Sequence, residues 1–218
     1  MATITFKDAT QDGIILPEHY ILTTTPEDRR VLVTKNETGF KGTQTFTLEA
    51  GKTQLWRLEQ EENGLKLWGK PTKEELTLCG QDGFQRGPDT MHRVIRELYD
   101  MPGILETAQA CSLPEKDYFF SDIEKAYQAG KKYERQDERI MWYWLASRCV
   151  DLSSAGAWFG VFFVNSGGVY AYSLYGSDGG TYSNTLAVRP VATPKSTLLL
   201  EREDCDGSYE HPWICLSK

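Results

Sequence analysis

The chain has 218 residues, of which 40% are hydrophobic and 25% charged, as in ordinary globular proteins of one domain or one domain with an appendage. Its formal net charge of −7 argues against a nucleic-acid surface, which needs clustered Lys and Arg. Its apolar runs are too short to cross a bilayer, and its N-terminus lacks the pattern of a signal peptide, so we expect cytoplasmic synthesis and no membrane insertion.

Residues 1–80 are expected to form a β-rich N-terminal part that packs on a main domain, residues 81–218. Short alternating segments predict strands, and Asn36–Gly39 and Asn63-Gly64 predict turns between them. The predicted strands are 4–6, 20–25, 30–34, 43–48, 54–58 and 65–68.

Two helices are expected in the middle of the chain. Asp89-Thr90 is typical of a helix cap, and apolar residues follow it at helical spacing as far as Tyr99. Ser121 and Glu124 form a capping box that predicts a second helix. The glycine-containing segment 80–83 is expected to be a turn.

Strands are expected to return after residue 140. Residues 141–146 predict a buried strand, and strands 158–164 and 169–174 flank a turn of Asn and Gly residues at 165–168. Trp142, Trp144 and Trp213 are expected in the core. Trp158 falls on the opposite strand face from Phe159, which favours its exposure.

The segment 151–185 has an unusual composition. It contains no Lys, Arg, Glu or His and only two Asp, while Gly, Ser, Tyr, Asn and Thr dominate it. Tyr supplies large rigid contact area and the small polar residues supply adaptable hydrogen bonds, as in recognition surfaces. Composition alone favours a recognition face and a plain surface hairpin region about equally.

Five segments of the C-terminal half form a set of motifs: Trp144-Leu-Ala-Ser-Arg148, Phe159-Gly-Val161, Val164-Asn-Ser-Gly-Gly168, Leu174-Tyr-Gly-Ser-Asp-Gly-Gly180 and Ala187-Val-Arg-Pro-Val191. Together they resemble a family of C-type-lectin-fold domains found in gut Firmicutes and their phages. The resemblance covers roughly residues 90–216. It implies an α+β fold of two helices and a small twisted antiparallel sheet. We therefore expect a C-type-lectin-like domain with a β-rich N-terminal part.

The same family includes the variable proteins of diversity-generating retroelements. In those proteins a reverse transcriptase rewrites adenines in the codons of a C-terminal lectin-fold segment. Residues 151–185 have the composition that such rewriting leaves, and 186–190 would be the invariant strand after it. The resemblance thus implies a phage or prophage variable protein, carried in a phage virion.

The motifs of enzymes and metal sites are absent from the sequence. The chain lacks the Glu-Pro-Asn and Trp-Asn-Asp motifs of calcium-dependent lectins, a nucleophile elbow and a phosphate loop. Its scattered cysteines form no CxxC pair, which predicts reduced, mostly buried thiols; a bridge between Cys205 and Cys215 is a minor alternative. We expect no enzyme activity, no metal and no cofactor.

The sequence therefore predicts a ligand-binding or display protein that binds a protein or a cell-surface glycan through residues 151–185. The expected contact residues are Trp158, Tyr170, Tyr172, Tyr175, Asp178, Tyr182 and Asn184. Trp144 is expected to be structural, as are Arg148 and Arg189, each paired with an acid such as Asp151. Two alternatives stay open: a structural virion component using this face for contacts between copies, and an enzyme with an undetected site.

Overall fold

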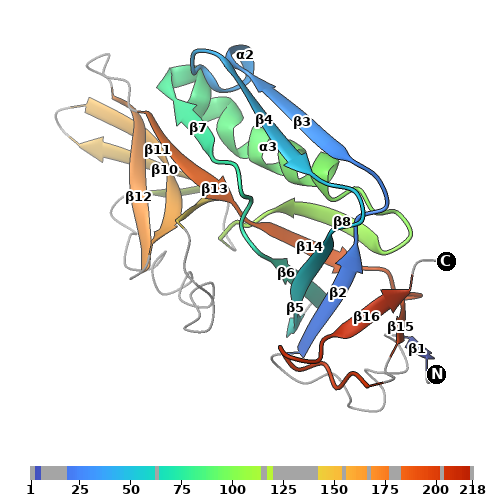
Figure 1. Ribbon diagram of the computed structural model, residues 1–218. Coiled ribbons are helices and arrows are strands. Elements are labelled where there is room, and N and C mark those ends of the chain that lie inside the picture. Colours follow the sequence, from blue (N-terminus) through green and yellow to red (C-terminus); the bar gives the residue numbers. More distant parts are fainter. Residues whose placement is uncertain are drawn as a thin grey trace.

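The computed structural model describes residues 3–5, 19–61, 64–113, 117–119, 142–153, 156–165, 168–176, 183–201 and 204–216. These residues form a β-rich α+β fold with two helices and three sheets, which confirms the expected fold class at this level. The two larger sheets lie at opposite ends of the molecule in Figure 1. Neither described helix has the length and apolar character that a membrane span requires.

The larger sheet combines strands from both ends of the chain. Its order is β1-β15-β16-β2-β5-β6-β14-β8, so β16 lies between β15 and β2. The strands are β1 (Thr3–Thr5), β2 (His19–Thr24), β5 (Thr53–Glu61), β6 (Gly64–Gly69), β8 (Leu105–Ala110), β14 (Pro190–Pro194), β15 (Leu199–Glu201) and β16 (Trp213–Leu216). Residues before position 80 and after position 190 therefore share one hydrogen-bonded layer.

The second sheet has the order β12-β11-β10-β13-β7, with β9 beside β10. Its strands are β7 (Leu76–Cys79), β9 (Asp117–Phe119), β10 (Tyr143–Ser153), β11 (Gly156–Asn165), β12 (Gly168–Gly176) and β13 (Ser183–Val188). β10, β11 and β12 form an antiparallel meander, of which the sequence predicts the β11–β12 hairpin; β10 extends past the predicted strand 141–146 to Ser153. The chain then returns to the other side of β10, where β13 runs parallel to it, so the expectation of a purely antiparallel sheet is wrong.

Helix α3 (Gly80–Leu98) packs between the second sheet and a smaller layer. That layer is the hairpin of β3 (Arg29–Thr34) and β4 (Thr43–Leu48), with the single-turn helix α2 (Lys35–Thr38) between its strands (Figure 1). The buried face of α3 carries Met91, Val94, Ile95 and Leu98, at the predicted helical spacing. This helix joins the β3–β4 hairpin and the sheet into one apolar core.

The beginning of α3 differs from the prediction. The helix starts at Gly80 rather than at the Asp89-Thr90 cap, so the segment 80–83 is its first turn, and Pro88 lies inside it. Gly87 lies inside the helix and allows it to pack closely on the sheet, because a Cβ there would lie 3.2 Å from Leu78 Cδ2 of β7. The predicted second helix at Ser121 lies outside the described residues.

Two predicted turns also differ in detail. Gly64 is the first residue of β6 and pairs with Glu61, so it belongs to the strand rather than to the turn. Residues 35–38 form α2, and Gly39 ends it with φ of 82°, a conformation that favours glycine. The chain still reverses here as predicted, through the helix. Glu37 Oε2 caps the start of α2 by accepting a 3.2 Å hydrogen bond from the Thr34 backbone amide.

The apolar core has two parts, one on each face of the second sheet. The part beneath α3 contains Trp144 and extends to Trp213, both of them fully buried as predicted. The other part gathers around Trp68 and Phe162. Trp142 is 48% exposed, so its predicted place in the core is wrong.

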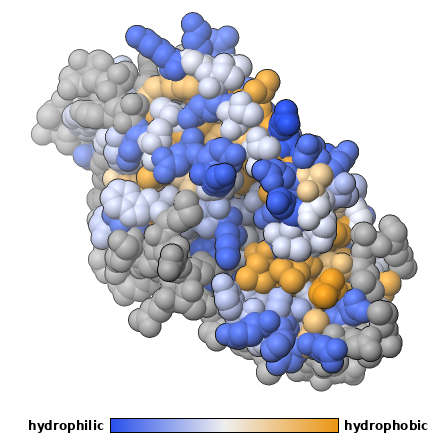
Figure 2. All heavy atoms as spheres, in the orientation of Figure 1, coloured by the Kyte–Doolittle hydropathy of each residue, from blue (hydrophilic) through white to orange (hydrophobic). Residues whose placement is uncertain are grey.

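On the face shown in Figure 2, hydrophilic side chains cover much of the described surface, and apolar ones gather in separate patches.

Candidate functional site

The β10–β12 meander has two faces that the strand register assigns. β11 alternates regularly: Val161 belongs to the core beneath α3, and Phe162 belongs to the core on the other side. Residues opposite one another in the register lie on the same face, so Phe163 shares the α3 side of the sheet with Tyr170 of β12. We call this side the α3 face.

Three aromatic rings on the α3 face form a continuous row that reaches the surface, and we call Trp142, Phe163 and Tyr170 the aromatic strip. The ring centroids of Trp142 and Phe163 are 6.4 Å apart, and those of Phe163 and Tyr170 are 5.7 Å apart. Trp142 is 48% exposed and Tyr170 is 44% exposed, whereas Phe163 between them is half-buried. The strip spans the meander, with Phe163 on β11, Tyr170 on β12 and Trp142 immediately before β10.

Buried groups hold the strip in place from below. Trp144 packs edge-on against Phe163 at 6.2 Å and against Tyr172 at 5.6 Å. Its Nε1 donates a 2.8 Å hydrogen bond to the Leu76 carbonyl oxygen of β7, so it ties the meander to the far edge of the sheet. Desolvation raises the pKa of the Tyr172 hydroxyl, which therefore stays neutral. The exposed rings thus rest on a fixed support, which lowers the entropy lost when a partner binds.

An irregular stretch of β10 anchors the meander to the chain before it. Between Trp144 and Arg148 the register with β11 shifts, which marks a bulge. Within the bulge, the Ala146 amide donates to the Cys111 carbonyl oxygen, and Ser147 Oγ accepts a 2.8 Å hydrogen bond from the Leu113 amide. These contacts fix where β10 lies relative to the segment that follows β8.

The structure separates the predicted contact residues. Tyr170 and Tyr172 lie on the α3 face, but Tyr172 is packed against the core and only Tyr170 is strongly exposed. Tyr175 is half-buried and stacks on Phe159 at 6.2 Å. Asp178 and Tyr182 lie outside the described residues.

The two remaining predicted contacts lie apart from the strip. Asn184 is opposite Leu78 in the register of β13 and β7, and its Oδ1 accepts a hydrogen bond from the Thr185 amide. Trp158 is half-buried, and its place on the opposite face from Phe159 follows the predicted alternation. The described contact residues therefore form no single cluster, and Tyr170 is the only one of them that is strongly exposed.

Sequence reasoning missed two members of the strip, Trp142 and Phe163. Alternation does place Trp142 on the same face as Trp144, two residues later. Alternation does not show how far the residues packed over the α3 face extend along β10, so it could not predict that Trp142 is exposed. For the same reason it could not predict that Leu152, at the other end of β10, is 66% exposed.

The two arginines predicted to be structural have different surroundings. Arg189 is 1% exposed; its Nε donates to the Gly69 carbonyl oxygen at 3.0 Å, and its guanidinium lies 5.4 Å from the Tyr143 ring centroid and 5.7 Å from that of Trp68. These contacts join the residue between β13 and β14 to β6 and β10. Arg148 is half-buried and lies opposite Val161 in the register, on the α3 face.

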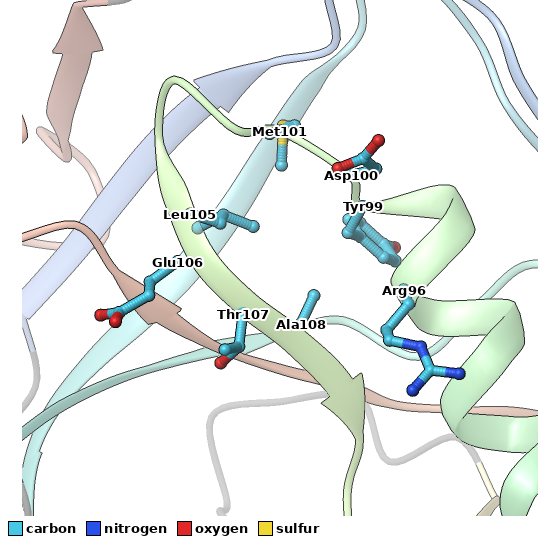
Figure 3. Close-up of a pocket in the computed structure, with 8 residues that line it drawn as sticks. All are labelled: Arg96, Tyr99, Asp100, Met101, Leu105, Glu106, Thr107 and Ala108. Atoms are coloured by element: carbon cyan, nitrogen blue, oxygen red, sulfur yellow. The ribbon is translucent and has the colours of Figure 1, made fainter.

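A pocket of about 220 Å³ lies between the end of α3 and β8 (Figure 3). Leu105 and Ala108 point into it, and Glu106 points away. At its rim, the Asp100 carbonyl oxygen accepts a 2.8 Å hydrogen bond from Arg29 Nη2. The volume is below the roughly 300–1,000 Å³ of typical small-molecule sites. This pocket therefore supports a ligand site less well than the aromatic strip does.

Desolvation keeps the neutral form of the buried titratable groups near these sites. It raises the pKa of Tyr99, which lines the pocket, and Glu74 raises it further. Burial likewise raises the pKa of the Cys149 thiol, in the core on the other face of the meander. All five cysteines are free thiols, and the described residues contain no group of three His, Cys, Asp or Glu that could hold a metal ion.

The chain matches no family model, no curated protein and no solved structure.

Proposed function

We propose that this protein is a non-enzymatic binding protein that presents the aromatic strip to a protein or surface glycan. The observation that carries the proposal is the continuity of Trp142, Phe163 and Tyr170 across the meander, with two rings exposed above a buried support. Large aromatic anchors on a fixed scaffold supply most of the energy at many interfaces. The predicted binding segment 151–185 contains two of the three strip residues.

We further propose that the meander and α3 belong to a C-type-lectin-like fold of the kind displayed by phage or prophage variable proteins. Two features support this proposal: α3 packs against a meander that begins with Trp144-Leu-Ala-Ser-Arg148, and the chain leaves β13 through Ala187-Val-Arg-Pro-Val191. The small polar residues of 151–185 would then be diversified positions around the aromatic strip. A place in a virion follows from the same proposal.

The surroundings of the strip favour a neutral ligand surface. No charged residue occurs in 156–176, the segment that supplies Phe163 and Tyr170, so a highly charged ligand would gain no ion pair from this segment. Arg148 is on the same face, but it is half-buried opposite Val161. Exposed rings bury apolar area against the C–H faces of a sugar or against aliphatic side chains. A neutral glycan or an uncharged protein patch fits this surface.

Binding of the labelled protein to a panel of neutral surface glycans and to intact Gram-positive cells tests the proposal. Trp142→Ala and Tyr170→Ser should each weaken binding at least about tenfold, because truncation of an aromatic anchor commonly costs 2 kcal/mol or more. Tyr209→Ser is the matched control, because Tyr209 is 52% exposed and packs on Tyr20 of β2, in the other large sheet. Equal binding by all four proteins would exclude the strip as the binding surface.

A further inference from the structure

The outer edge of β12 is an exposed pairing surface in the described structure. β12 is the terminal strand of its sheet and pairs with β11 alone. The β11–β12 hairpin closes on the pair Asn165 and Gly168, and alternate residues of an antiparallel strand direct their backbone groups to opposite edges. Val169, Ala171 and Ser173 therefore direct their N–H and C=O groups outward, and no described residue bonds to these groups.

Other strand edges in this fold are covered by side chains. At the opposite end of the same sheet, Gln44 accepts a 3.0 Å hydrogen bond from the Thr77 amide and donates to the Glu75 carbonyl oxygen, so it occupies the edge of β7. On β3, Arg93 Nη2 donates to the Leu32 carbonyl oxygen at 3.1 Å. Proteins also protect edges with charged residues or proline, and residues 168–176 contain neither.

We propose that β12 pairs antiparallel with β12 of a second copy of this chain, about a two-fold axis at Ala171. In this register Val169 lies opposite Ser173 of the second copy, and Tyr170 lies opposite Tyr172. The outward groups of Val169, Ala171 and Ser173 form the bonded pairs with the second copy. The tyrosines of the two copies meet on the α3 face, where cross-strand aromatic pairs are favourable.

The distribution of charge makes β12 suited to contact between two copies of this chain. Two chains of net charge −7 repel each other, so a contact between copies needs a surface without acidic groups. β12 is such a surface, and its two-fold pairing brings no like charges together. The register shift between β11 and β12 comes after Ser173, so the proposed pairing ends before the bulge.

The dimer would join two aromatic strips on one continuous sheet face. A two-fold axis perpendicular to a sheet keeps equivalent side chains on the same face, so both copies of Tyr170 would face the same way. One dimer could then bind two copies of a repeated surface ligand at once, and joining the two binding sites raises the overall affinity.

Mass measurement by light scattering, together with register-specific cross-linking, tests the proposal on the full chain. At about 100 µM the protein should have twice the mass of one chain, and the mass should fall on dilution, because association depends on protomer concentration. Ala171→Cys should form a disulfide-linked dimer on mild oxidation, since bonded antiparallel pairs have Cα atoms about 5.5 Å apart, within disulfide range. Ser173→Cys is the matched control, because its two copies would be separated by four residues of strand, roughly 13 Å.

Two results would overturn the proposal. One is the mass of a single chain at all concentrations, which would indicate that the outer edge of β12 pairs with a strand of another protein instead. The other is a dimer in which Ala171→Cys cross-links no faster than Ser173→Cys and the wild-type chain. The measurement needs no ligand, so a failure of the proposed binding function would not affect its outcome.

Discussion

Replacing Trp144 by alanine removes the group that joins the meander to α3 and to β7. The side chain is fully buried, contacts Phe163 and Tyr172, and donates to the Leu76 carbonyl oxygen. Truncation of a buried Trp costs about 3–5 kcal/mol. For a domain of this size each kcal/mol lowers the melting temperature by roughly 2–4 °C, so we expect a fall of about 6–20 °C.

Two further variants separate the contributions. Trp144→Phe keeps most of the packing but leaves the buried Leu76 carbonyl without its donor, which costs about 1–3 kcal/mol. Trp142→Ala is the matched control, because it removes the same side chain two residues earlier at a position that is 48% exposed; surface changes usually stay within about 0.5 kcal/mol. Thermal unfolding followed by circular dichroism measures all three. The reasoning is refuted if Trp144→Ala melts within about 2 °C of the wild type, or if Trp142→Ala falls as far as Trp144→Ala.

Three other predictions concern a glycine, a thiol and metal ions. Gly160→Ala should lower the melting temperature by several degrees, because its Cβ would overlap the Tyr172 carbonyl oxygen, whereas Gly103→Ala, which has open space, should leave it unchanged. Burial raises the pKa of Cys215 from 9.0 to about 12, so the stability contributed by its neutral thiol is complete below pH 9.0 and is lost as the pH rises toward 12. Cys215→Ala should reduce the loss of stability between these pH values in denaturant titrations, and an unchanged pH dependence would contradict this. EDTA should leave the melting temperature unchanged, since the described residues hold no ligand cluster; a large fall would show that a metal contributes to folding.

Local sequence patterns predicted the parts of this fold that depend on neighbouring residues. The hairpin of β11 and β12 follows from alternation on both sides of a turn rich in glycine, and the buried face of α3 follows from helical spacing. The beginning of α3 was missed because Gly87 and Pro88 are typical helix breakers. In the structure Gly87 allows the helix to approach Leu78, a contact with a distant strand that no local pattern contains.

The candidate site was predicted only in part, for a similar reason. Tyr170 was predicted to be a contact residue because alternation and composition both pointed to it, and the structure shows that it is exposed. Trp142 and Trp144 have the same periodicity and the same residue type, yet one is 48% exposed and the other fully buried. The difference depends on how far the elements packed on the α3 face extend along β10. This is a property of tertiary packing rather than of the strand itself.

The position of β16 between β15 and β2 also affects how the chain folds during synthesis. Ile21 leaves the ribosome long before its register neighbour Trp213, which is about 190 residues further along the chain. One edge of β2 therefore stays open while these residues are synthesised, until long-range pairing closes the sheet. A premature stop before Trp213 would leave that edge permanently open, so we expect truncated chains to be recovered with chaperones or in aggregates.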